Sequence, residues 1–298
     1  MAPFLLFARV MRLGSVSGPV RRIAACQQDV STLALLQAVA PAAPEAQPED
    51  YRHKVVLKPW GHEYLIFENA SVAAWFLHIR HGYSTSMHCH PRKKTSLIVL
   101  TGHALCNTFE FRNYLNAHEA LVLDRGVFHS TKALSDGGLD LIEIETPPAK
   151  TDLVRLSDLY GRQASGYEGL TEMQTERLDR FGYFHLQAGP ATEHGEGRYA
   201  DTGGRYQVGV QAVRDGATLA DEAIESPEAL YGVLSGRLVA AAGAPAAETG
   251  DTVTAFWLDR QSPVVPEGSV LLMKTGPLAR PAQNVSERCV ALPRSMRP

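Results

Sequence analysis

The sequence contains few cysteines, and they lie far apart. Its 298 residues include four, at positions 26, 89, 106 and 289, and no two of them form a Cys-x-x-Cys pair. This pattern does not indicate a disulfide framework. We therefore expect reduced thiols and a cytoplasmic protein.

Two further features are missing, a stripe of basic residues and a long apolar run. The formal net charge is −3 and no Lys/Arg stripe is present, so nucleic acid is not expected as a partner. No stretch is long and apolar enough to span a membrane, so no membrane partner is expected either. The length is large for a single core and favours two domains.

Residues 1–50 are expected to be a flexible N-terminal extension. Four arginines precede the first acidic residue, Asp29, and this bias also allows a transit-like leader. Segment 37–50 is rich in Ala, Pro and Glu, which is typical of a linker. The folded part is therefore expected to begin near residue 51.

After the linker, short β-like segments alternate with turn residues. They lie at 55–58, 64–67, 73–80, 84–90, 96–100, 105–111, 120–123 and 139–145. Many short strands without long helices between them predict an antiparallel sandwich or barrel. A short helix is expected at 151–159, and the first domain is placed at 51–162.

A second series of strands is expected within residues 163–298. Segment 163–183 is polar and irregular, and the clearest strands are at 206–213, 230–234 and 253–258. Val99-Leu100-Thr101-Gly102 in the first series resembles Val233-Leu234-Ser235-Gly236 in the second. An internal repeat of this kind favours two copies of one barrel.

Histidines are concentrated in the first series, where eight of the eleven lie between His62 and His129. His88 and His90 are two residues apart in an expected strand, so both side chains leave the same face. His129 follows a turn at Gly126, at the start of another expected strand. Inward residues of neighbouring strands converge in a small barrel, so these three histidines can meet around one metal ion. The alternative is that histidines on a strand face water.

The spacing around these histidines resembles the two motifs of the cupin superfamily. Gly82, His88-Cys89-His90, position 95 and Gly102 follow the first motif, and segment 124–129 resembles the second, Pro-x-Gly-x-x-His. Residues 55–162 are most similar to the cupin domain of type II mannose-6-phosphate isomerases, through segments 58–63 (Lys-Pro-Trp-Gly-His-Glu), 141–145 and 152–162. Together with the internal repeat, this resemblance implies an all-β fold of two tandem cupin barrels (a bicupin), each a double-stranded β-helix or jelly roll.

The chain departs from the isomerase family at its ligand positions. Where that family has Gln, His, Glu and a later His, this sequence has His88, His90, Thr95 and His129. The neutral hydroxyl of Thr95 is a poor metal ligand. Three imidazoles without a carboxylate still bind one divalent ion, and zinc, iron, nickel and manganese are the candidates.

The second barrel is expected to be a degenerate copy. The internal repeat aligns the ligand positions with Glu222, Ile224, Ala229 and Leu271. No three-histidine set remains there, so residues 163–298 are expected to be structural, dimer-forming or a lid rather than a second active site.

Two groups of charged residues are candidates for catalysis and substrate binding. Glu143 and Glu145 share one strand face; they can move protons if that face lines the barrel, and are ordinary surface residues if it faces solvent. The basic run Arg92-Lys93-Lys94, and Lys132 downstream, can hold a phosphate or carboxylate. A solvated hairpin turn is the alternative for the basic run.

Three functional hypotheses follow. The resemblance implies a metal-dependent isomerase or epimerase of a sugar, sugar phosphate or nucleotide-sugar-related substrate, with Glu143 or Glu145 moving the proton. A three-histidine iron dioxygenase is the second, favoured by Thr95 in place of glutamate. A non-catalytic carbohydrate-binding or assembly module is the third, favoured by the degenerate second barrel. Cupin barrels often pair through exposed sheet faces, which leaves a homodimer open.

Overall fold

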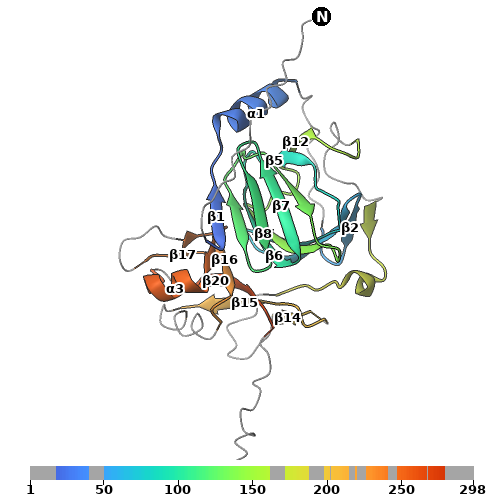
Figure 1. Cartoon of the computed structure of the whole chain (residues 1–298). Helices are drawn as coiled ribbons and strands as arrows, with labels where there is room; N and C mark the ends of the chain where they lie inside the picture. The colour runs from blue at the N-terminus through green and yellow to red at the C-terminus, as the bar shows by residue number, and fades with distance from the viewer. Residues whose placement is uncertain are drawn as a thin grey trace, which may run out of the picture.

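The computed structural model describes residues 18–39, 50–161, 172–187, 198–201, 203–214, 219, 226–240, 247–266 and 268–278. These residues form two β units, with the first unit above the second in Figure 1. Nearly all strand pairs are antiparallel, and the described helices are short. The expected all-β class with two barrels is confirmed.

The first barrel consists of two sheets. In spatial order, the eight-stranded sheet contains β1 (Val20–Ile23), β9 (Ala120–Leu123), β6 (Lys94–Thr101), β11 (Leu139–Thr146), β4 (Ala73–Ile79), β3 (Gly61–Glu68), β2 (Val55–Lys58) and β13 (Met173–Gln174). The five-stranded sheet contains β12 (Val154–Ser157), β5 (Met87–Cys89), β10 (His129–Ala133), β7 (His103–Thr108) and β8 (Arg112–Asn116). A short 3₁₀ helix, η2 (Leu178–Phe181), follows β13.

Strand β11 explains why both faces of the large sheet are apolar. Side chains alternate between the faces of a strand. Leu141 therefore joins the core inside the first barrel, whereas Ile142 and Ile144 join a second core on the outer face. Leu230 and Met273 of the second barrel pack into that outer core. Because one face fills the barrel and the other meets the second barrel, the strand is buried along nearly all of its length.

The second barrel repeats part of this plan. Its larger sheet contains β14 (Arg198–Ala200), β15 (Gln207–Val213), β20 (Val270–Gly276), β16 (Leu230–Ser235) and β19 (Thr252–Thr254), and β17 (Arg237–Leu238) pairs with β18 (Ala247–Glu248). Gly102 after β6 has φ 83° and Gly236 after β16 has φ 81°, and each opens the turn to the next strand. The repeated Val-Leu-x-Gly segment thus marks equivalent turns in the two units.

Apolar and polar contacts join the two barrels. Gly232 in β16 packs against the end of the Ile144 side chain in β11, so the two units are in close contact there. The buried Lys94 ammonium lies 2.7 Å from the Asp251 carboxylate, and the Ser96 and Thr252 hydroxyls are 2.8 Å apart. Since these groups are buried, their hydrogen bonds offset the cost of removing them from water.

Two expected elements differ in the structure. The helix expected at 151–159 is replaced by β12, because its backbone pairs with β5 in the antiparallel register Val154↔Cys89. The strand expected at 253–258 ends at Thr254, and helix α3 (Ala255–Gln261) begins there. The Thr254 hydroxyl accepts a hydrogen bond from the Trp257 backbone N–H at 2.9 Å, which caps this helix.

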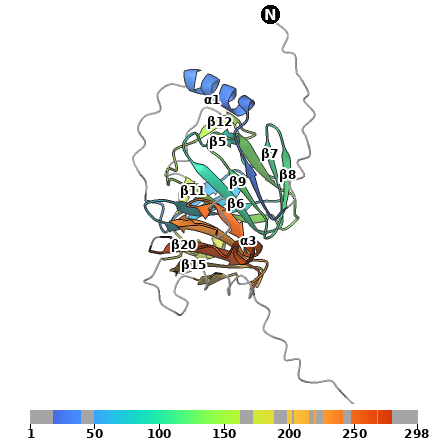
Figure 2. The ribbon, with the colours of Figure 1, turned by 90° about the vertical axis from the view of Figure 1, so that its left-hand side faces the viewer.

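Within the extension expected at 1–50, the structure describes two elements, β1 and helix α1 (Gln27–Val39). Strand β1 pairs in parallel with β9 and so extends the first barrel. Helix α1 lies beside β12 at the end of this barrel (Figure 2). Residues 1–17 and 40–49 lie outside the described part, as do most residues of the expected linker. Among the described helices, none has the length and apolar character needed to cross a membrane.

Candidate metal centre

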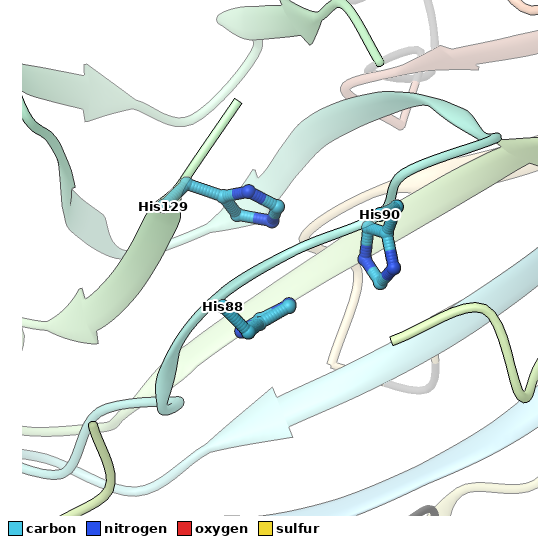
Figure 3. Close-up of side chains that lie close together, drawn as sticks. All are labelled: His88, His90 and His129. Carbon is cyan, nitrogen blue, oxygen red and sulfur yellow. The ribbon is translucent and has the colours of Figure 1, made fainter. Parts of the chain in front are cut away.

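The structure brings together the three histidines that the spacing singled out. His88 on β5 is directly opposite His129 on β10, and His90 follows β5. Figure 3 shows the three rings converging, and the ring centroids are 4.5 to 5.6 Å apart. One ring nitrogen from each histidine lies within 4.8 Å of the others, which is close enough for a shared ion.

Each imidazole is oriented by a backbone carbonyl. Nδ1 of His88, His90 and His129 lies 2.8, 2.7 and 3.0 Å from the carbonyl oxygens of Ser86, Asp152 and Val127. A carbonyl only accepts, so Nδ1 carries the proton and donates. The Nε2 atoms consequently keep their lone pairs, which is the arrangement of metal-ligating histidines.

Burial keeps the rings of His88 and His129 neutral. Burial, and then the charge of His90, lowers the pKa of His129 to about 4. The same cause, followed by the charges of His129 and His90, holds the pKa of His88 well below its usual range. Histidine binds a metal in its neutral form, so these ligands are ready near neutral pH.

Glu143 supplies the carboxylate that the motif lacks at Thr95. It lies on the inward face of β11, and its Oε1 is 3.6 Å from His90 Nε2. Burial opposes its ionisation, but the charges of Lys150 and Lys93 favour it, and the pKa of Glu143 is lowered. Two ligands bound about 2.1 Å from one tetrahedral ion lie roughly 3.4 Å apart, so the observed spacing is close to that of two ligands.

The donor set therefore fits a divalent ion. His90 Nε2 is buried and has no hydrogen-bond partner among the described residues. Its lone pair faces an ionised carboxylate, an unfavourable arrangement unless a cation or proton lies between the two groups. In the described part of the chain, the clusters that can hold a metal are His88, His90 and His129, and His90, Glu143 and Glu145. Ala229 and Leu271 of the second barrel offer no ligand atoms, and Glu222 and Ile224 lie outside the described residues.

The two carboxylates expected to act on substrate both line the barrel. Glu143 and Glu145 are 8% and 1% exposed, so the solvent-facing alternative is excluded. Both border a cavity of about 60 Å³ next to His88 and His90. Lys93 Nζ lies 2.7 Å from Glu145 Oε1, and both groups are buried.

The three residues of the expected basic turn do not form one exposed cationic group. Arg92 is mostly exposed, at 77% of its side chain, and lies 3.2 Å from Asp152. Lys93 and Lys94 are buried in ion pairs with Glu145 and Asp251, and the latter belongs to the second barrel. Lys132 is exposed on β10, where alternation directs it away from the face that carries His129.

Other residues of the cavity wall were not singled out by the sequence. They include Lys58, Glu63, Leu77, Lys150 and Arg155. Lys58 and Glu63 belong to segment 58–63, and the resemblance of this segment to the isomerases is the sequence feature that could have identified them. Arg155 belongs to segment 152–162, which carries the same resemblance, whereas no local pattern marks Lys150.

Asp152 positions His90. Its carboxylate accepts the backbone N–H groups of Arg92 at 2.8 Å and Lys93 at 3.1 Å, while its carbonyl accepts His90 Nδ1. We expect Asp152→Ala to weaken metal binding by about 10- to 100-fold, as for other groups that orient metal ligands. Competition with a chelating dye measures this, with the exposed Asp179→Ala as the matched control. Equal affinities in a folded Asp152→Ala variant and in the control would contradict this role.

The sequence matches no protein-family model and no curated protein. Solved structures resemble about a third of the chain. KdgF from Halomonas sp. is 18% identical, with 35% of this chain and 91% of that chain covered and a TM-score of 0.30. An RmlC-like cupin from Shewanella frigidimarina is 17% identical, with 38% and 93% covered and a TM-score of 0.28. The cupin domain of Schizosaccharomyces pombe Cnp3 is 14% identical, with 37% and 74% covered and a TM-score of 0.28.

The latter two neighbours are named as cupins. Identities and TM-scores this low carry no argument about activity. The link to mannose-6-phosphate isomerases stays a prediction.

Proposed function

We propose that the chain is a metal-dependent enzyme whose active site is the cavity of the first barrel. The observation that carries the proposal is the orientation of the three imidazoles, each fixed at Nδ1 by a carbonyl so that its Nε2 is available. Such oriented ligands beside a cavity are typical of a catalytic site. His88, His90 and His129 would hold the ion, with Glu143 as a further ligand.

The reaction we favour is a proton shift in an isomerase or epimerase. A divalent ion held by these ligands supplies Lewis-acid polarisation of a carbonyl or hydroxyl. Glu143 and Glu145 line the same cavity, so the carboxylate that is not bound to the ion, Glu145 or an unligated Glu143, can take a proton from a carbon and return it to a neighbouring one. Lys93 keeps Glu145 in place through their buried ion pair. A sugar or sugar phosphate is the substrate suggested by the resemblance of residues 55–162 to mannose-6-phosphate isomerases.

Solvent exchange tests this reaction. The metal-loaded chain is incubated in heavy water with mannose 6-phosphate or fructose 6-phosphate, and deuterium at the carbon next to the carbonyl is followed by NMR. We expect exchange in the parent protein and a loss of about 100-fold or more in Glu143→Gln or Glu145→Gln. The exposed Glu176→Gln is the matched control. Exchange at the parent rate in both carboxylate variants would contradict the assigned roles.

A three-histidine iron dioxygenase is the second candidate. It is favoured by Thr95, which lies on β6 opposite Glu145 and places no carboxylate at the motif position. Oxygen consumption by the iron-loaded protein, with a thiol or diketone substrate and no deuterium exchange, would favour this reading.

A further inference from the structure

The cavity beside the histidines is also lined by buried charges. Lys58 Nζ lies 3.4 Å from Glu63 Oε1, and Lys150 Nζ lies 2.9 Å from the same oxygen. Arg155, on β12, is 9% exposed and borders the same cavity. This wall holds three cationic side chains that the proposed proton shift does not use.

Lys150 is held rigidly and stays charged. Its ammonium lies 3.7 Å from the centroid of the Trp75 ring and 3.7 Å from Glu145. Burial opposes its charge, but Glu145 and Glu63 outweigh burial and raise the pKa of Lys150. A charged group fixed in this way needs little reorganisation when it binds an anion.

A bound metal ion makes the cavity electropositive. The charged residues that line it are Lys58, Lys150 and Arg155, and Glu63, Glu143 and Glu145. These cations and carboxylates balance, while Lys93 adds a positive charge behind Glu145. A divalent ion therefore leaves an excess of positive charge in a buried site, which is costly without a compensating anion.

The space inside the cavity is small. A volume of about 60 Å³ accommodates roughly four to six water centres, at about 10–15 Å³ each. Leu77 and Leu153 offer an apolar surface beside the charges. We propose that the substrate is a small organic oxyanion, a carboxylate or phosphate, held by Lys58, Lys150 and Arg155 with its carbon skeleton toward the metal ligands. This inference rests on the proposed function and names its substrate class.

Calorimetry with matched charged and neutral probes tests the inference. Lactate is compared with lactamide, and glycerol 3-phosphate with glycerol, on the metal-loaded full chain. We expect at least one anion to bind about 10-fold or more tightly than its neutral partner, and the preferred pair tells a carboxylate from a phosphate site. Equal binding within both pairs, or binding by neither anion, would overturn the inference.

Variants locate the anion in the cavity. Lys150→Gln and Arg155→Gln are each expected to lose the preference for the anion, whereas Arg177→Gln, an exposed residue outside the cavity wall, keeps it. Circular dichroism checks that each variant is folded. If a variant is unfolded, the comparison of charged and neutral probes on the parent protein still tests the inference. A folded Lys150→Gln and a folded Arg155→Gln that both retain the preference would place the anion elsewhere and overturn the assignment.

Metal analysis of the same samples separates this inference from the proposed function. Bound metal without any anion preference overturns the inference alone. If the parent protein binds no metal, the proposed function fails, and the same titration of the metal-free chain tests the cationic wall by itself. If the metal-free chain prefers the anion and Lys150→Gln does not, anion binding by Lys58, Lys150 and Arg155 is supported. If the metal-free chain shows no preference, that assignment is overturned.

Discussion

Replacing His88 or His90 with alanine is expected to weaken metal binding by about 100- to 1,000-fold. Structural zinc sites with four ligands contribute about 10–16 kcal/mol, or roughly 3–4 kcal/mol for each ligand. Both histidines contribute an oriented Nε2, and the three ring nitrogens lie within 4.8 Å of one another. When one ring nitrogen is lost, no other histidine can take its place, because the other described histidines lie outside this cluster.

Metal content after gel filtration, together with chelator competition, measures this loss. The matched control is His103→Ala on β7, since His103 is exposed and bonds to Asn116 at 3.0 Å, away from the cluster. The control should retain the metal of the parent protein. If His88→Ala and His90→Ala each retain one equivalent with unchanged affinity, the three-histidine assignment is wrong.

Gly61→Ala is expected to lower the free energy of unfolding by about 4 kcal/mol or more. Gly61 has φ 156°, a conformation that residues with a Cβ rarely adopt. An added Cβ would overlap the backbone carbonyl oxygen of His78 on the paired strand β4. Because the obstacle is backbone, relief requires separating β3 from β4. The close approach explains the glycine of the Lys-Pro-Trp-Gly segment in physical terms.

Urea unfolding of both variants tests this explanation, with Gly82→Ala as the control. Gly82 also has a positive φ, 77°, but an added Cβ there meets no atom within 4 Å. The control adds only backbone strain, which lowers the free energy of unfolding by about 1–2 kcal/mol. Equal losses in the two variants would show that the carbonyl contact is not responsible.

The histidine pattern could be predicted because its geometry is local. Two residues apart on a strand means one face, and His88 and His90 need no further information to lie together. The turn at Gly126 placed His129 at the start of the neighbouring strand β10. Alternation within segment 139–145 also identified the shared face of Glu143 and Glu145, but whether that face lined the barrel depended on packing.

The buried ion pairs could not be predicted, because the two partners of each pair are far apart in the sequence. Lys93 belongs to a run of three basic residues, which by itself is typical of an exposed turn. Its partner Glu145 is 52 residues further along the chain, and the partner of Lys94 is 157 residues away in the second barrel. Such pairs are specified only by the tertiary fold. The parallel pairing of β1 with β9, between segments about a hundred residues apart, was missed for the same reason.

The position of the carboxylate shows how the site differs from the motif. Sequence comparison looks for glutamate at position 95, on β6, and finds threonine. In the folded chain, Glu143 reaches His90 from the adjacent strand β11. A carboxylate on a neighbouring strand is invisible to a spacing rule, because the rule follows one strand at a time.

Elemental analysis of the purified parent protein tests the central claim most directly. We expect close to one equivalent of a divalent metal per chain, as isolated or after incubation with zinc, iron, nickel or manganese. We also expect a strong chelator to remove it. A protein that is folded and binds none of these ions would contradict the metal centre and the enzyme proposed from it.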